Sequence, residues 1–161
     1  MKSREYFRDF YYNFMTPKAV KIINEYGPYD RALYIECDNG RLIEFIAANE
    51  IHGMDNSEIE SVPIVKRIDA PDKVYDLIVI SEKDYSTYSK DQIYEWVRKS
   101  SARIIVVIGT RHYMKEYDFG NILAGEELIE DIIIRVYSFT ECNRVYDEEV
   151  WTEIPNMTKQ F

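Results

Sequence analysis

The chain has little of the chemistry that marks metalloproteins and secreted proteins. Its 161 residues include two cysteines and two histidines, and neither Cys37 and Cys142 nor His52 and His112 are spaced like metal ligands. No metal site is therefore predicted, and the distant cysteines indicate free thiols of a reducing cytoplasm. No apolar run approaches the ~18 residues of a membrane span, and the N-terminus has no signal-peptide core. We expect a cytoplasmic protein without a membrane partner.

Positive charge is also scarce. The net charge is -9 and the pI is about 4.8, whereas binding to a phosphate backbone requires a basic patch. Nucleic acid is therefore not indicated as a partner. The hydrophobic share of 46% and the charged share of 30% are ordinary for a globular protein, and 161 residues are enough for one domain with its own core.

Apolar runs separated by short polar segments predict alternating strands and helices. A helical N-terminal segment over 1–30 precedes a five-stranded parallel core over 31–110, and a β-hairpin follows over 132–154. The expected strands are 31–36, 51–55, 64–69, 75–81, 103–109, 132–139 and 143–154, with helices at 41–49 and 89–99 and a helical turn at 126–131. A short turn at 140–143 makes the last two strands antiparallel. The prediction is a single α/β domain over 1–161, with a seven-stranded, mostly parallel sheet flanked by helices.

Glycine is scarce in the loop where it matters most. Leu33 to Leu42 has the pattern of a strand, a tight loop and the start of a helix, as in nucleotide-binding α/β domains. This loop contains only Gly40. Glycine lets the backbone approach a cofactor closely, so each missing glycine puts a side chain into that space. Glu36 and Asp38 are two such side chains, and of these Asp tolerates positive φ better.

The order of these elements resembles the class I S-adenosylmethionine-dependent methyltransferases over nearly the whole chain. In that family the first strand ends in an acid-x-Gly-x-Gly-x-Gly loop, which holds the methionine part of the cofactor. Aligned by the helix that follows, Gly40 matches the last glycine, Glu36 and Asp38 replace the first two, and Tyr34 replaces the acid. A shifted alignment makes Glu36 the acid and Gly40 the middle glycine. The glycine motif is degenerate in both.

The later motifs match this family better. Gly53-Met54-Asp55 resembles the family's Gly-Val-Asp, whose acid takes the ribose hydroxyls, and Asp69 stands where the family has an acid beside the adenine. Ser81 falls where the active-site loop begins. The resemblance implies S-adenosylmethionine as the cofactor, held by Glu36, Asp38, Gly40, Asp55, Asp69 and Ser81. Asp76, at the entry of its strand, is expected to be structural.

The absence of the first two glycines from this loop favours a methyltransferase-like domain that is non-catalytic or weakly active and acts as a binding or partner subunit. The alternative is an active methyltransferase for a small molecule or a protein. A nicotinamide-dependent oxidoreductase is excluded because Gly-x-Gly-x-x-Gly is absent. The sequence identifies no catalytic residues. A protein partner or a homodimer is expected on the aromatic face of the N-terminal helix, unless these rings cover the domain's own sheet: Tyr6, Phe7, Phe10, Tyr11 and Phe14.

Overall fold

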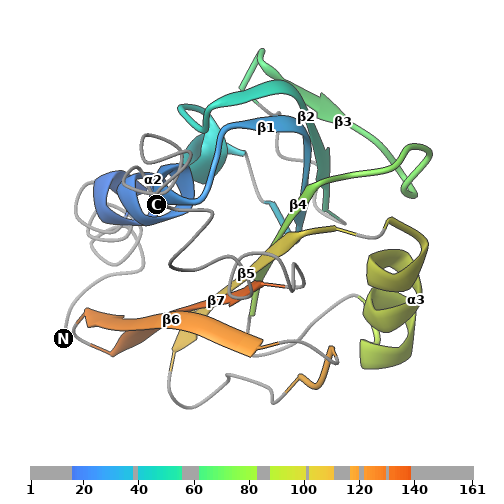
Figure 1. Cartoon of the computed structure of the whole chain (residues 1–161). Coiled ribbons are helices and arrows are strands. Elements are labelled where there is room, and N and C mark those ends of the chain that lie inside the picture. Colours follow the sequence, from blue (N-terminus) through green and yellow to red (C-terminus); the bar gives the residue numbers. More distant parts are fainter. Residues whose placement is uncertain are drawn as a thin grey trace, which may run out of the picture.

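A computed structural model describes residues 16–37, 40–55, 62–82, 88–100, 102–110, 117–119, 122–129 and 131–138. The strands are β1 (Tyr29–Ile35), β2 (Ala48–Met54), β3 (Val65–Arg67), β4 (Leu77–Ser81), β5 (Ile104–Thr110), β6 (Ile122–Ile129) and β7 (Ile132–Ser138). The helices are α2 (Thr16–Glu25) and α3 (Lys90–Ser100), and a short 3-10 turn, η2, spans Arg41–Ile43. The strands form one seven-stranded sheet in the order β3-β2-β1-β4-β5-β7-β6 (Figure 1).

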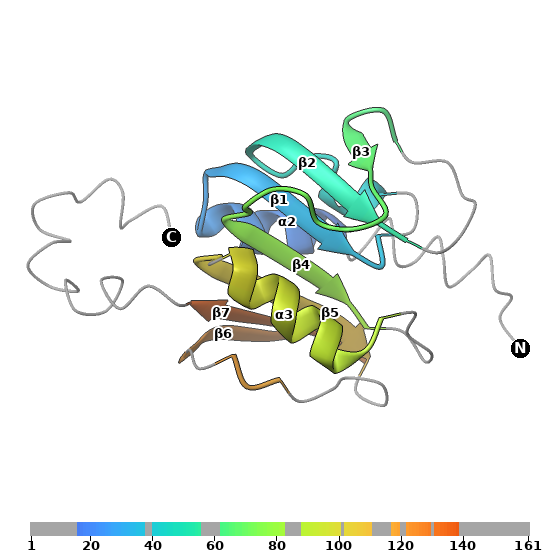
Figure 2. The ribbon, with the colours of Figure 1, turned by 90° about the vertical axis from the view of Figure 1, so that its right-hand side faces the viewer.

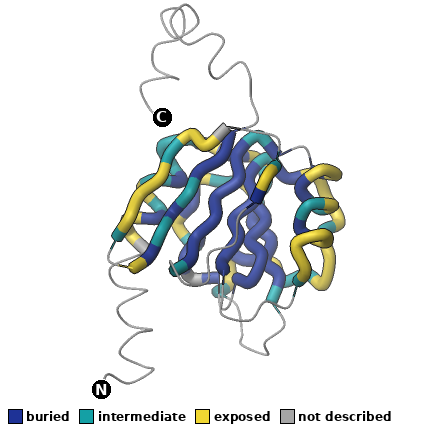
Figure 3. Tube along the Cα trace, turned by 90° about the horizontal axis from the view of Figure 1, so that it is seen from below, coloured by how far each residue is buried: buried dark blue, intermediate teal, exposed yellow. Residues whose placement is uncertain are grey.

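The two helices lie on opposite faces of this sheet (Figure 2). Strands β1 to β5 are parallel, as predicted. Side chains of a strand alternate between its two faces, so Ala32 and Tyr34 join the core with α2, whereas Leu33 and Ile35 join the core with α3. Because both faces are covered, the middle of the molecule is buried (Figure 3).

The start of α3 follows from its sequence. The side chain of Ser89 accepts a hydrogen bond from the Gln92 backbone N–H at 3.2 Å, and the Gln92 side chain accepts one from the Ser89 N–H at 2.9 Å. This reciprocal pair is a capping box, which satisfies amide groups that the helix leaves unbonded. The predicted helix is confirmed, with Ile93 and Val97 buried on its inner face.

The antiparallel end of the sheet is shifted by one strand from the prediction. Strand β7 is antiparallel to β5 and to β6, so an antiparallel hairpin is present. It is formed over 122–138 rather than 132–154, and positions 143–154 lie outside the described residues. The helical turn expected at 126–131 is wrong, because 122–129 is strand β6. An edge strand carries charged side chains, and its pattern then loses the apolar alternation that identifies a buried strand.

The helix expected at 41–49 is also wrong. Only the 3-10 turn η2 forms, and strand β2 begins at Ala48, with pairing extended by a 2.9 Å bond from the Tyr29 N–H to the Ala47 carbonyl. Residues 48 and 49 are therefore part of strand β2 and are not available to the predicted helix. Leu42 and Ile46 are buried, whereas Phe45 is 71% exposed.

Two features bear on partners and membranes. Within the described part of the chain, no helix is long and apolar enough to cross a membrane. The aromatic face from Tyr6 to Phe14 lies outside the described residues, so its role stays a prediction.

Candidate functional site

The strand order singles out the carboxyl ends of β1 and β4. In the sheet, β1 lies between β2 and β4. The connection that leaves β1 leads to β2 on one side, whereas the connection that leaves β4 leads to β5 on the other side. Connections that diverge in this way leave a crevice, and open α/β sheets bind their ligands there. Glu36 and Cys37 directly follow β1, Asp55 follows β2, and Glu82 follows β4. These residues form the described part of the candidate site.

Glu36 has the backbone conformation of a glycine. Its φ is 65°, and Gly40 at the other end of the loop has a φ of 78°. The left-handed region costs a non-glycine residue about 1–2 kcal/mol. The Glu36 side chain is also buried, with 3% of its surface exposed. Positions 36 and 40 thus both have the backbone conformation that glycine adopts most easily.

The loop is packed tightly against the end of β2. The Cys37 N–H donates to the Met54 carbonyl at 2.9 Å, and the Gly40 N–H donates to the Cys37 carbonyl at 2.8 Å. A Cβ at Gly53 would lie 2.8 Å from Cys37 Sγ and 2.8 Å from a Val65 methyl. Real side chains do not approach this closely, so glycine at 53 is required by packing within the protein itself.

Asp55 lies where the resemblance places the ribose-binding acid. Its side chain is only 4% exposed, and its Oδ1 is 4.0 Å from Nη2 of Arg67 on β3. The carboxylate therefore lies at the carboxyl end of the sheet beside a positive charge. A ligand hydroxyl would share this carboxylate with Arg67.

Ser81 makes a contact that the sequence did not predict. Its hydroxyl oxygen is 2.6 Å from the hydroxyl oxygen of Tyr34, and this hydrogen bond is buried. Tyr34 is the residue that replaces the family's acid. The bond joins β1 to β4 beneath the loop, so it gives Ser81 a structural role beside the binding role that the resemblance implies.

Acidic side chains at this edge act on two nearby tyrosines. Burial raises the pKa of the Tyr88 hydroxyl, and the nearby carboxylates of Glu36 and Asp55 raise it further. Burial likewise raises the pKa of Tyr117, followed by the effects of Glu82 and, more weakly, Glu36. Negative neighbours disfavour a tyrosinate and favour a cation. Glu36, Asp55 and Glu82 therefore add negative charge to this edge, and Arg67 partly offsets it beside Asp55.

The structure brings together some of the predicted residues. Glu36, Gly40, Asp55 and Ser81 lie at the carboxyl ends of neighbouring strands, whereas Asp69 is exposed beyond the end of β3. Asp38 lies outside the described residues. The sequence did not reveal the contacts of Tyr34, Arg67, Tyr88 and Tyr117. The position of Glu82 at the carboxyl end of the strand at 75–81 was predictable, because it follows a buried strand directly, whereas tyrosines in connecting segments follow no periodic pattern.

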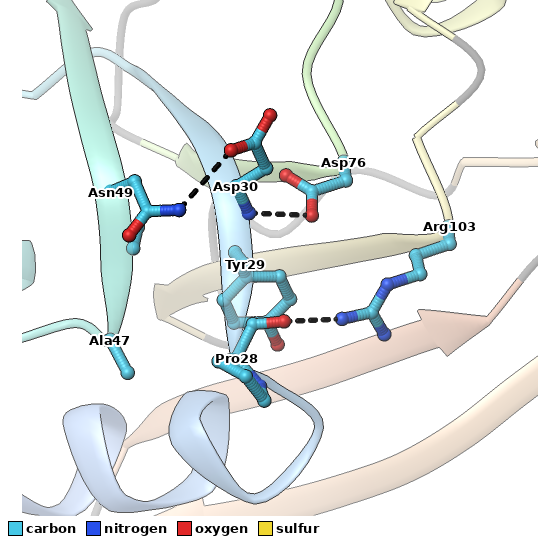
Figure 4. A pocket seen from close by; sticks show the side chains of 8 residues that line it. Pro28, Tyr29, Asp30, Ala47, Asn49, Asp76 and Arg103 are labelled. Carbon is cyan, nitrogen blue, oxygen red and sulfur yellow. Dashed lines mark hydrogen bonds between the residues drawn. The ribbon is translucent and has the colours of Figure 1, made fainter.

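A groove of about 660 Å³ lies at the opposite, amino-terminal edge of the parallel strands (Figure 4). Its lining residues are Pro28, Tyr29, Asp30, Ala47, Ala48, Asn49, Asp76 and Arg103. The Arg103 guanidinium donates to the carbonyl oxygens of Tyr26 at 2.9 Å and Pro28 at 2.7 Å. It also lies over the Tyr29 ring, 5.0 Å from the centroid. These contacts hold the α2–β1 connection, and they direct the guanidinium toward the protein itself.

Asp76 has a similar role in the groove. Its two carboxylate oxygens accept hydrogen bonds from the backbone N–H groups of Asp30 and Arg31, each at 2.8 Å. The predicted structural role of Asp76 is thereby confirmed. Asp76 and Arg103 both bind the backbone of β1 or of the segment that leads into it, so these contacts stabilise the fold.

Metal chemistry has no support within the described ranges. No group of three or more histidine, cysteine, aspartate or glutamate side chains there is arranged to hold a metal ion.

Comparison with known proteins identifies the fold. No protein-family model and no curated protein matches the sequence. A proposed methyltransferase from Pseudomonas syringae matches with a TM-score of 0.60 at 12% identity, over 78% of this chain and 99% of its own. The N-methyltransferase NodS from Bradyrhizobium japonicum, solved with S-adenosyl-L-homocysteine, matches with a TM-score of 0.59 at 12% identity, over 80% and 87%.

An S-adenosylmethionine-dependent methyltransferase from Aquifex aeolicus matches with a TM-score of 0.56 at 11% identity, over 82% of this chain and 93% of its own. At such identities the likeness concerns the fold alone. The chain has the class I methyltransferase fold, including its antiparallel seventh strand.

Proposed function

We propose that this chain is a methyltransferase-fold protein that binds S-adenosylmethionine weakly, has little or no catalytic activity of its own, and acts as a binding or partner subunit. The observation that carries this proposal is Glu36. It keeps the backbone conformation of the first glycine, with a φ of 65°, but adds a buried side chain. Position 36 thus keeps a glycine-like backbone without the open space that glycine leaves for a cofactor.

Part of the cofactor fits these residues. The sulfonium and the amino group of S-adenosylmethionine are positive, and Glu36, Asp55 and Glu82 make this edge negative. Opposite charges a few ångströms apart attract by about 1–4 kcal/mol in partly solvated sites. Asp55, nearly buried at the end of β2, supplies the carboxylate that the resemblance assigns to the ribose hydroxyls.

Another part of the cofactor does not fit. The carboxylate tail of S-adenosylmethionine is repelled by the Glu36 carboxylate. A helix that follows the loop would offset this repulsion through its N-terminal amide groups. Here that helix is reduced to the 3-10 turn Arg41–Ile43. The loss of this anion-binding end supports weak binding of the cofactor.

The second candidate is an active methyltransferase for a small molecule or a protein. Positive φ at both Glu36 and Gly40 favours it, because these two loop positions have the backbone conformation that glycine adopts most easily. Cofactor affinity separates the two candidates, since an active enzyme of this kind needs a site that fits the whole cofactor.

The proposal is tested by titrating the full chain with S-adenosylmethionine and, separately, with S-adenosylhomocysteine. Binding is monitored through the ¹H–¹⁵N chemical shifts of the protein. We expect a Kd of roughly 10⁻⁴–10⁻³ M for S-adenosylmethionine, or about -4 to -5.5 kcal/mol. S-adenosylhomocysteine, which lacks the sulfonium charge, should bind more weakly. Low-micromolar Kd values for both ligands would support the active enzyme instead, and shifts that never saturate would remove S-adenosylmethionine as the ligand.

The same titration of the Asp55→Asn variant tests whether Asp55 contributes directly to binding. Loss of a charge-assisted hydrogen bond should weaken binding by about 1–3 kcal/mol, so that saturation is no longer reached. Asp30→Asn removes the same charge at the opposite edge of the sheet, where Asp30 is exposed, and should leave the titration unchanged. Equal effects of the two variants would exclude a direct role for Asp55.

A further inference from the structure

Strand β6 presents apolar side chains at the edge of the sheet. It is the outermost strand beyond β7, and Leu123 and Leu128 are 46% and 50% exposed. Leu123 lies opposite Tyr137 and Leu128 lies opposite Ile133 on β7. Tyr137 and Ile133 are four residues apart, so their side chains share one face of the sheet. Leu123 and Leu128 therefore lie on that face as well.

A β-bulge produces this arrangement. Residues five apart on a regular strand point to opposite faces, but the register of β6 shifts between Leu123 and Gly125. The extra residue, Ala124, restores both leucines to the same face. Between them lies Glu126, whose carboxylate accepts a hydrogen bond from Arg135 Nε at 2.6 Å. The charge between the two leucines is thus paired within the same chain.

The sequence of β6 is self-complementary at its ends. It reads Ile122-Leu123 at one end and Leu128-Ile129 at the other. A two-fold axis perpendicular to the sheet, passing between Gly125 and Glu126, places Leu123 opposite the partner's Leu128. Each leucine then faces a leucine on the same side of the sheet. A two-fold interface requires this match of a surface with itself.

We propose that β6 is the contact surface of a symmetric homodimer, in which two copies join edge to edge through antiparallel β6 strands. Each leucine packs against a leucine of the partner, which gives one leucine pair at each end of the contact, on the face shared with α3. The bulge interrupts regular backbone pairing at the centre, so the two leucine pairs supply much of the association. The proposal is independent of cofactor binding.

Molar mass in solution tests the dimer. By sedimentation equilibrium of the full chain, we expect twice the chain mass of 19.2 kDa at micromolar concentrations. The double variant Leu123→Lys/Leu128→Lys should be monomeric, because lysine on an edge strand opposes pairing. The matched control is Phe45→Lys/Val74→Lys, at side chains that are 71% and 62% exposed elsewhere on the surface, and it should stay dimeric.

Cysteine cross-linking tests the register. In a Cys142→Ser background, Leu123→Cys/Leu128→Cys should form a covalent dimer under mild oxidation, because each new cysteine faces a cysteine of the partner. Either single variant should stay monomeric on a non-reducing gel, because its cysteine faces a leucine. A monomeric wild type would overturn the proposal. A dimer that survives the lysine variant, or equal cross-linking by the single variants, would place the contact elsewhere.

Discussion

Replacement of His52 by phenylalanine is expected to lower the free energy of unfolding by about 2–3 kcal/mol. The His52 side chain is fully buried in β2, and both of its ring nitrogens have partners. Nδ1 lies 2.7 Å from the hydroxyl of Tyr75, which is also fully buried, and Nε2 is bonded to Glu50. Phenylalanine fills the space but leaves the Tyr75 hydroxyl and the Glu50 carboxylate without this partner.

Urea unfolding followed by circular dichroism measures this change. Tyr75→Phe, which removes one hydroxyl and keeps the ring, should cost about 1 kcal/mol, the usual net value of one hydrogen bond. A loss below about 0.5 kcal/mol in His52→Phe, within the range of ordinary surface changes, would show that the network contributes little to stability.

The pH dependence provides a second signature of the same network. Desolvation acts to raise the pKa of Glu50, but hydrogen bonds from His52 and Arg31 outweigh it and lower that pKa below its ordinary value. Stability from a lowered carboxyl pKa is present above the ordinary pKa of glutamate and is lost as the pH falls through the lowered one. Wild-type stability should therefore fall in this acid range, and the fall should be smaller in His52→Phe.

Asp76→Ala is expected to cost about 2–3 kcal/mol. The substitution removes two hydrogen bonds from backbone N–H groups to one carboxylate, each at 2.8 Å. Bonds to a charged group are worth about 1.5–3 kcal/mol each, and water in the open groove replaces part of that value. Without the carboxylate, β1 loses these two bonds to the segment that precedes β4, while the backbone bond from the Asp76 N–H to the Arg31 carbonyl at 3.1 Å remains.

The matched control for this variant is Asp30→Ala, because Asp30 lines the same groove. Asp30 is exposed, and its side chain accepts a 3.2 Å bond from Asn49. A surface contact of this kind should change stability by less than about 0.5 kcal/mol. Equal losses in the two variants would mean that general charge at this edge, rather than the backbone bonds of Asp76, determines stability.

The sequence predicted those elements whose signals are local. Strand β4 is a continuous apolar run bounded by polar residues, and α3 begins at a capping box formed by Ser89 and Gln92. The errors occur where pairing between distant segments decides the structure. β6 is a strand because β7 pairs with it, although Glu126 and Glu127 weaken its apolar alternation. The helix at 41–49 is lost because β2 pairs with β1 from Ala48 onward.

The candidate site was predictable only in its position along the chain. The ends of β1, β2 and β4 follow from the fold, and they place Glu36, Asp55 and Ser81. The positive φ of Glu36 was not predictable, because glutamate rarely adopts it and the strain is sustained by packing around the loop. The contact of Ser81 with Tyr34 likewise depends on the register of β1 against β4, which places Ile35 beside Ile80.

Titration of Glu36→Gly with S-adenosylmethionine tests most directly whether residue 36 limits cofactor binding. Glycine adopts a φ of 65° without strain and opens the loop, so the Kd should fall at least ~10-fold, equivalent to about 1.4 kcal/mol. Glu36→Gln, which keeps the size and removes the charge, should gain much less. An unchanged or weaker affinity in Glu36→Gly would contradict the account.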